Sequence, residues 1–218
     1  PVFVEIPVNL QRFKGDVAAL PVYEPPVIET VIDLDEIRKA VAILRSARRP
    51  GIFAGWGANG AKEELKILAE RLDAPVSTTL QGLGTFPGDH PLHTGLAFGP
   101  SAVPASRNAF AGCDVMLAIG TRFSEIGTGF FFSAETPENL IHVDIDPDVF
   151  NKNYPAKVAL AGDSKKILEA LLNTMGNDSG ASNRARTSGE MRINIATDKN
   201  NYRTIWQKHD SKGRVNPE

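Results

Sequence analysis

Apolar residues between positions 33 and 175 follow two alternating patterns. Short apolar runs lie at 51–54, 115–120 and 140–145, a strand is predicted at 75–79, and short strands are expected at 93–97 and near 158–160. Runs of this length bounded by Gly, Pro or Asp are typical of buried strands. Longer stretches with apolar residues three and four positions apart separate them, which is the spacing of a helix with one buried face.

The helical stretches are predicted from about 33 to before Pro50, and over 61–72, 102–111 and 164–175. Asp33 or Asp35 can cap the first of these helices, because a carboxylate accepts hydrogen bonds from the free amides of a helix start. Buried strands that alternate with helices indicate an α/β fold. We therefore predict a doubly wound, mostly parallel sheet with helices on both faces.

The remaining segments lack this alternation. Residues 1–8 (PVFVEIPV) form an apolar run that predicts one buried strand, and the chain would then begin in the middle of a longer protein. Prolines in 14–31 predict an extended linker. Residues 176–201 are polar and rich in small residues, which predicts a flexible linker, and the stretch NYRTIWQKHDSK can form a short helix.

Composition narrows the class of protein. Hydrophobic residues make up 42% of the chain and charged residues 23%, which is enough for a sizeable core. A formal net charge of −2 without a basic stripe argues against nucleic acid or an anionic membrane as partner. No apolar run approaches the ~20 residues of a membrane span. The single cysteine, Cys113, cannot form an internal disulfide, so we expect a cytoplasmic protein.

Three glycines follow the run at 51–54 in the spacing G-x-G-x-x-G: Gly55, Gly57 and Gly60. Such glycines let a backbone approach a phosphate at the start of the next helix. A dinucleotide fingerprint also needs an acid after the second strand, and 77–82 contain none. A standard NAD site is therefore disfavoured, and two interpretations stay open: ligand contact, or a tight turn between strand and helix.

Polar residues follow the other predicted strands as well. They are Thr79 and Gln81, then Gly120, Thr121 and Arg122, then Asp144 and Asp146, then Gly162 and Asp163. In a doubly wound sheet ligands bind at the carboxyl ends of the strands. Arg122 can meet a phosphate in a bidentate fashion, and the carboxylates can hold ribose hydroxyls. The alternative is that Asp146 and Asp163 only cap the following helices.

Other reactive residues favour structural roles. His90 and His93 lie three positions apart in a loop without a further histidine or cysteine nearby, which is weak evidence for a metal. Cys113 beside the run 115–120 is interpreted as a small apolar filler. The phenylalanines at 130–132 are interpreted as core or interface. No Ser/His/Asp set, G-x-S-x-G elbow or Walker motif is found.

Three stretches, TTLQGLGTFPGDHPLHTG, LAIGTRF and LIHVDIDPDVFNKNYPAKVALAGDSKKILEAL, resemble the central domain of thiamine-diphosphate-dependent enzymes, most closely acetolactate synthase large subunits. The resemblance implies a six-stranded Rossmann-like sheet that holds the ADP half of FAD. Carried over by motif, the cofactor contacts would be Gly55, Trp56, Gly57, Thr79, Leu80, Gln81, Gly120, Thr121, Arg122, Asp144, Ile145 and Asp163. No catalytic or metal-binding residue is carried over.

The resemblance also implies a domain organisation. PVFVEIPVNLQ resembles the last strand of the family's pyrimidine-binding domain, and GRVNPE resembles the entry to its pyrophosphate-binding domain. We predict domain fragments at 1–13 and 213–218, linkers at 14–32 and 176–212, and the central domain at 33–175. Thiamine diphosphate and Mg²⁺ would bind outside this chain. The expected parent is a homodimeric or homotetrameric carboligase or lyase that acts on a 2-oxo acid such as pyruvate, and this chain alone would be inactive.

One stretch departs from the family pattern. Synthases carry a sequence like R-F-D-D-R-V-T-G where this chain has RFSEIGTG at 122–129. Ser124, Ile126 and Gly127 thus replace an acid, an arginine and an apolar residue, which makes tight FAD binding less expected and admits flavin-free members of the superfamily. Two other classes stay open: a stand-alone nucleotide-binding module, and an NAD-dependent enzyme with a sirtuin-like Rossmann fold.

Overall fold

A computed structural model describes residues 3–16, 19, 22–24, 31–124, 128, 135–176 and 185–208. Its centre is a six-stranded sheet of β1 (Pro50–Ala54), β2 (Val76–Thr78), β3 (His93–Leu96), β4 (Val115–Ile119), β5 (Asn139–Asp144) and β6 (Val158–Ala161). The strand order is β3-β2-β1-β4-β5-β6, and every neighbouring pair is parallel. The predicted fold class is confirmed, and each predicted strand is present within about two residues of its expected bounds.

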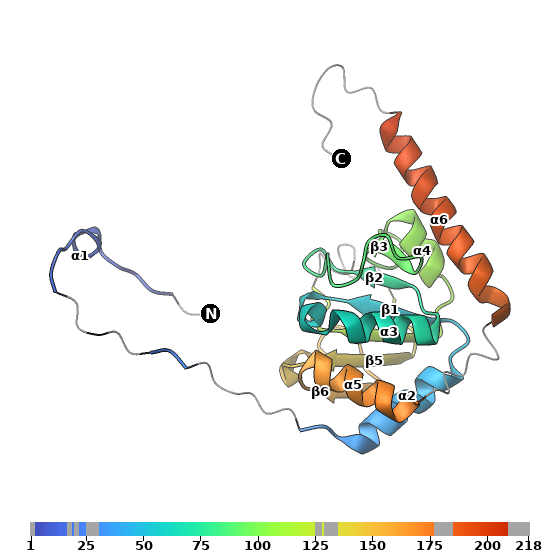
Figure 1. The fold of residues 1–218 in the computed structure, drawn as a ribbon, viewed down its shortest axis with the longest axis horizontal. Coiled ribbons are helices and arrows are strands. Elements are labelled where there is room, and N and C mark those ends of the chain that lie inside the picture. Colours follow the sequence, from blue (N-terminus) through green and yellow to red (C-terminus); the bar gives the residue numbers. More distant parts are fainter. Residues whose placement is uncertain are drawn as a thin grey trace.

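Helices cover both faces of the sheet (Figure 1). The larger core lies on the face covered by α2 (Leu34–Ser46), α3 (Lys62–Leu72) and α5 (Ser164–Met175). Successive side chains of a strand point to opposite faces. Ile52 of β1 therefore enters this core, whereas Phe53 enters a smaller core on the other face with Phe98 and Phe123. The short helix α4 (Pro104–Phe110) lies over that second face and contributes Phe110.

Caps fix the starts of two helices. The side chain of Asp33 accepts hydrogen bonds from the amides of Asp35 and Glu36 at 2.9 and 3.1 Å. The side chain of Asp163 accepts one from the amide of Lys166 at 3.1 Å. Both carboxylates satisfy amides that have no partner within the helix.

The prediction of a buried strand at 1–8 is wrong for the residues that the structure describes. Residues 3–7 belong to none of the six strands, and Val8–Gln11 form the short helix α1 without a buried residue. Phe3 is 88% exposed. Figure 1 shows this segment apart from the sheet. A single extended segment without a neighbouring strand leaves its backbone donors and acceptors unpaired, so apolar composition alone does not make it a strand.

The prediction of a flexible linker after Met175 is wrong from residue 185 onward. Helix α6 (Ala185–Gln207) spans 23 residues and packs against α4 and β3 (Figure 1). Polar contacts hold much of it: Arg192 pairs with Asp73, and Asp198 accepts a hydrogen bond from Asn108 at 2.9 Å. The end of α6 overlaps the short helix expected in NYRTIWQKHDSK, whereas its earlier part has no apolar period by which spacing could reveal it.

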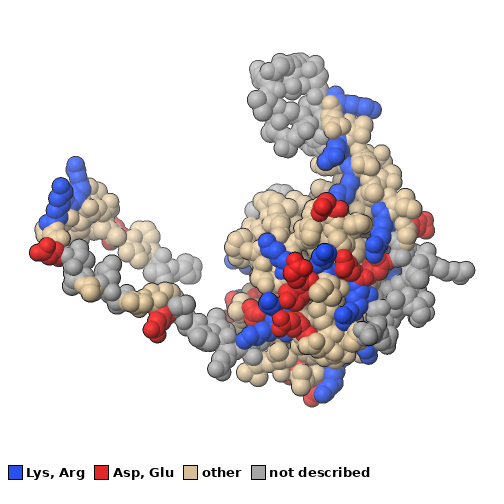
Figure 2. Space-filling model, in the orientation of Figure 1, with Lys and Arg blue, Asp and Glu red and all other residues tan. Residues whose placement is uncertain are grey.

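None of the described helices is both long enough and apolar enough to cross a membrane. Figure 2 shows acidic and basic side chains interspersed on the face that carries α3 and α5, so this face has no stripe of one charge.

Candidate functional site

The carboxyl ends of the parallel strands bring distant segments together at one edge of the sheet. β1 lies between β2 and β4, so the chain leaves β1 toward one side of the sheet and returns from β3 to its other side at β4. This reversal of strand order is the position at which doubly wound sheets bind ligands. Predicted site residues follow β1, β2, β4, β5 and β6 at this edge, which we call the carboxyl edge: Gly55–Gly57, Thr79–Gln81, Gly120–Arg122, Asp144–Ile145 and Asp163.

The glycines at the carboxyl edge pack against one another. The amide of Gly55 donates to the carbonyl of Ile119 at 2.8 Å, and that of Gly57 donates to the carbonyl of Gly120 at 3.1 Å. A Cβ atom added at Gly55 would lie 2.3 Å from the Gly120 oxygen, and one at Gly57 would lie 2.7 Å from the Gly120 Cα. Two of the three motif glycines are therefore required for contact between loops, which supports the tight-turn interpretation for them.

The phosphate mechanism inferred from the G-x-G-x-x-G spacing is not supported by this geometry. The amides of Gly55 and Gly57 already have internal acceptors. A 3-10 helix over Trp56–Ala61 runs directly into α3, so α3 does not start with free amides after the glycines. Gly60 has no heavy atom within 4 Å of an added Cβ and needs no glycine for packing. A phosphate at this edge would depend on side chains instead.

The carboxyl edge carries an apolar rim, by which we mean the exposed side chains of Trp56, Leu80 and Ile145, together with buried hydroxyl residues. Trp56, Leu80 and Ile145 are 67%, 50% and 49% exposed, although each is large and apolar. The hydroxyl residues Thr79 and Thr121, which follow β2 and β4 at the same edge, are buried. Exposed apolar groups beside buried polar ones are typical of ligand-binding surfaces.

The acids at this edge shape the local turns. Oδ1 of Asp144, which is 9% exposed, accepts a hydrogen bond from the amide of Asp146 at 3.0 Å. Asp146 in turn accepts one from Asp148 at 2.9 Å at the start of a 3-10 helix, Pro147–Val149. With the Asp163 cap of α5, the capping interpretation holds for Asp146 and Asp163. Each carboxylate has two oxygens, so a cap does not exclude a ligand contact.

Arg122 is exposed in a loop that two other residues hold. The imidazole of His142 donates from Nε2 to the carbonyl of Thr121 at 2.7 Å. The side-chain amide of Asn153 donates to the carbonyls of Arg122 and Phe123 at 3.0 and 3.1 Å. Sequence reasoning missed both residues, because neither the middle of a strand nor a loop asparagine carries a motif.

The histidines of the GDHPLHTG loop have structural contacts. His90 bonds Glu70 at 3.1 Å and accepts a hydrogen bond from the amide of Leu92. Burial, with the nearby Lys199, lowers the pKa of His93 to about 4, so its ring is neutral at pH 7. Among the residues that the structure describes, no three His, Cys, Asp or Glu side chains lie close enough together to hold a metal ion. The structural interpretation is supported for both histidines.

Cys113 is a mostly buried thiol. Its Sγ donates to the carbonyl of Val115 at 3.0 Å, and it packs against the smaller core. Burial raises the pKa of this thiol to about 12. These contacts support the interpretation of Cys113 as a small apolar filler. The phenylalanines at 130–132, as well as Ile126 and Gly127, lie outside the described residues.

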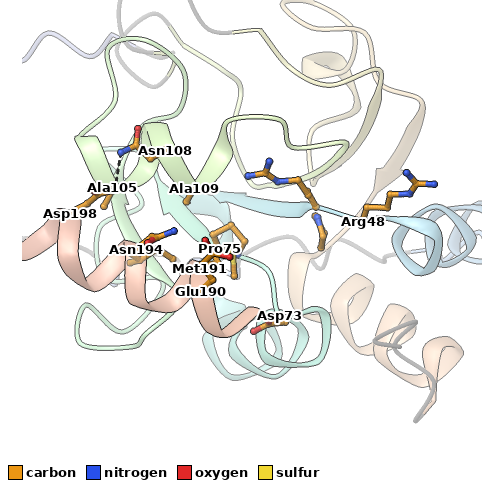
Figure 3. A pocket seen from close by; sticks show the side chains of 13 residues that line it. Arg48, Asp73, Pro75, Ala105, Asn108, Ala109, Glu190, Met191, Asn194 and Asp198 are labelled. Atoms are coloured by element: carbon orange, nitrogen blue, oxygen red, sulfur yellow. Dashed lines mark hydrogen bonds between the residues drawn. The ribbon is translucent and has the colours of Figure 1, made fainter. Parts of the chain in front are cut away.

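Three cavities lined by described residues border α4 or α6. One of about 310 Å³ lies beside α6 at the start of the strands (Figure 3). Figure 3 shows Glu190, Asn194 and Asp198 of α6 facing this cavity, and Asn108 of α4 bonded to Asp198. Two others, of about 370 and 540 Å³, border α4. Polar side chains that line the first cavity bond α6 to the rest of the domain. This cavity therefore lies in the interface between α6 and the domain.

Comparison with known proteins gives one family. The family model described as "Thiamine pyrophosphate enzyme, central domain" matches residues 37–171. A probable acetolactate synthase large subunit of Methanocaldococcus jannaschii is 37% identical over 182 residues, which are 79% of this chain and 30% of that protein. The acetolactate synthase isozyme 2 large subunit of Escherichia coli is 34% identical over 174 residues, 78% of this chain and 31% of that protein.

A protein with another printed activity is similar as well. A probable 2-ketoarginine decarboxylase of Pseudomonas aeruginosa is 41% identical over 140 residues, which are 63% of this chain and 24% of that protein. The chain thus spans about a quarter to a third of the length of these relatives.

Proposed function

Because the chain belongs to the family of thiamine pyrophosphate enzyme central domains, we propose that it serves as the non-catalytic central domain of an acetolactate synthase-like carboligase or lyase. We further propose that its carboxyl edge binds an adenine nucleotide, either ADP or the ADP half of FAD. The observation that supports this binding site is the convergence of five strand ends, with an apolar rim and an exposed arginine, at the reversal of strand order.

The residues at this edge fit the chemistry of such a ligand. Arg122 is exposed and offers a planar fork of donors to a phosphate. Asp144 uses Oδ1 for the amide of Asp146, so Oδ2 is the oxygen that would accept from a ribose hydroxyl. Trp56 and Leu80 present the apolar surface that an adenine ring requires. In this proposal the glycine amides play no part in binding the phosphates.

The proposed parent enzyme uses thiamine diphosphate with Mg²⁺, and this cofactor supplies the electron sink for cleaving or forming a bond beside a carbonyl. Its substrate would be a 2-oxo acid, and its assembly a homodimer or homotetramer. The similar proteins include synthases and a decarboxylase, so the proposal covers both carboligation and decarboxylation. Residues 33–175 remain the predicted extent of the central domain.

An NAD-dependent enzyme is less well supported. Such a site needs an acid after the second strand for the ribose, and Thr79, Leu80 and Gln81 follow β2 instead. A stand-alone nucleotide-binding module would use the same edge as the proposed domain. Such a module would differ from the proposed central domain in one respect, because no other domain would contact the nucleotide that it binds.

We expect the chain to bind ADP measurably, and to bind FAD without the tightness of a flavoprotein. Arg122→Ala should weaken ADP binding by about 10- to 100-fold, since hydrogen bonds to charged groups contribute ~1.5–3 kcal/mol. Arg48→Ala is the matched control: this arginine is also exposed but precedes β1 at the opposite end of the sheet. Isothermal titration calorimetry of the three proteins gives the affinities.

Two outcomes of this titration would contradict the proposal. If neither ADP nor FAD binds at millimolar concentration, the domain is a structural spacer. If both arginine variants bind ADP as well as the unchanged protein does, the nucleotide lies elsewhere.

A further inference from the structure

The loop Gly120–Phe123 between β4 and the following chain has an unusual backbone. Gly120 has φ +57° and Phe123 has φ +51°. A positive φ is strained for a residue with a bulky side chain and persists only where surrounding contacts enforce it. This loop carries Thr121 and Arg122, and Arg122 is the residue on which the proposed phosphate contact depends. Contacts that hold the loop therefore determine where the guanidinium lies.

Two side chains from outside the loop provide these contacts. His142 of β5 donates to the carbonyl of Thr121, and Asn153, after the 3-10 helix at Pro147–Val149, donates to the carbonyls of Arg122 and Phe123. All three successive carbonyls thus receive a side-chain donor. Within the loop, the amide of Phe123 donates to Oγ1 of Thr121 at 3.2 Å. Backbone hydrogen bonds to Val143 and Gly57 hold Gly120 at the start of the loop. The carbonyls that follow it are held by side chains that lie 21 and 31 positions further along the chain.

Packing alone does not explain an imidazole at position 142. The ring is buried, with Phe123 and Phe150 edge-on at centroid distances of 5.1 and 5.0 Å. Its Nδ1 is buried and has no hydrogen-bond partner among the described residues. A buried acceptor without a donor is destabilising, and a phenyl ring would avoid it in the same aromatic surroundings. The hydrogen bond from Nε2 to the loop is therefore the interaction that an imidazole makes here and a phenyl ring cannot make.

The protonation state of His142 is consistent with its hydrogen bond to the carbonyl of Thr121. A carbonyl only accepts, so Nε2 must carry the hydrogen, and Nδ1 is then an acceptor in the neutral ring. Burial lowers the pKa of His142, although the Thr121 carbonyl and Asp144 act in the opposite direction. The neutral ring therefore keeps the donor on the nitrogen that faces the loop.

We propose that His142 and Asn153 are positioning residues that hold the loop Gly120–Phe123 in its strained conformation and so place Arg122 for a nucleotide phosphate. The second half of this inference rests on the proposed function. The first half, the hold on the loop, concerns the chain without any ligand and can be tested separately.

The test compares His142→Phe with the unchanged protein. The phenyl ring keeps the aromatic packing and removes both the donor to Thr121 and the unpartnered Nδ1, two effects of opposite sign, so we expect the melting temperature to change by less than about 4 °C. Amide hydrogen exchange at Phe123 in the ligand-free protein should accelerate by about fivefold to tenfold, the factor given by one lost hydrogen bond. The dissociation constant for ADP should rise by a similar factor.

His142→Gln is the rescue variant, because its amide nitrogen can donate from near the position of Nε2. It should restore slow exchange and ADP affinity in large part. Phe150→Leu is the control for packing: this ring contacts His142 but does not bond the loop, and its loss should leave exchange at Phe123 unchanged. Asn153→Asp removes the other donor with little change in volume and should act on the loop in the same direction as His142→Phe.

Each result decides between the alternatives. If His142→Phe folds and both exchange and ADP affinity match the unchanged protein, the imidazole does not position the loop and the inference is wrong. If His142→Phe fails to fold, Asn153→Asp makes the same comparison. If the unchanged protein does not bind ADP, the proposed function fails, while the exchange rates still show whether the two side chains hold the loop.

Discussion

Gly120→Ala should lower the free energy of unfolding by about 2–5 kcal/mol. The new Cβ would lie 2.3 Å from Cα of Gly57, and the backbone at position 120 has φ +57°. The left-handed conformation costs an alanine about 1–2 kcal/mol, and overpacking adds about 1–3 kcal/mol. The contact is with backbone atoms of another loop, so no flexible side chain can move aside.

Gly60→Ala is the matched control, because Gly60 belongs to the same G-x-G-x-x-G motif as Gly57. Nothing lies within 4 Å of a Cβ at Gly60. In a helical segment alanine is favoured over glycine by about 0.5–1 kcal/mol, so this variant should be as stable as the unchanged protein or slightly more stable. Urea unfolding followed by circular dichroism gives both values. Equal effects of the two substitutions would show that the contact between the loops of β1 and β4 is not as tight as described.

The thiol of Cys113 should react with a disulfide reagent about 10³-fold more slowly in the native protein than in the unfolded chain at pH 8. Only the thiolate attacks. Burial raises the pKa from 9.0 to about 12, which lowers the thiolate fraction at pH 8 from roughly a tenth to roughly one in 10⁴. The direction follows from the sign of the shift, since a raised thiol pKa disfavours the reactive anion.

The measurement is the rate of thionitrobenzoate release with Ellman's reagent, in buffer and in 8 M urea. Cys113 is the only cysteine in the chain, so the whole signal comes from one site. A native rate within about tenfold of the rate in urea would mean that the smaller core does not shield Cys113, and that its interpretation as a packed filler is wrong.

The strands and the helices that cover them could be predicted from the sequence. A strand that is buried on both faces consists largely of apolar residues, and this pattern is visible within a short segment. β1, β4 and β5 lie in mostly apolar runs, and α2, α3 and α5 each carry one apolar face. Helix α6 gave no such signal. Its contacts to the domain include ion pairs and hydrogen bonds between residues about 90 to 120 positions apart, such as Arg192 with Asp73 and Asp198 with Asn108. Spacing within a segment contains no information about such partners.

The candidate site was predictable in position but not in mechanism. Strand order places Thr79, Thr121 and Asp144 at one edge, as expected for a doubly wound sheet. The sequence left two interpretations of the glycines open, because it cannot show that a Cβ at Gly57 would meet Gly120. His142 was missed for a related reason: a histidine within a buried strand becomes informative only when the strained loop beside it is seen.

Binding of ADP at the carboxyl edge is tested most directly by a titration of the ¹⁵N-labelled chain followed in two-dimensional amide spectra. We predict chemical-shift changes at Trp56, Leu80, Thr121 and Ile145, which belong to four different strand ends. Amides at the opposite end, such as Asp73 beside α6, should not change. Shifts confined to the α6 cavity, or no shift at millimolar ADP, would contradict a nucleotide site at the carboxyl edge.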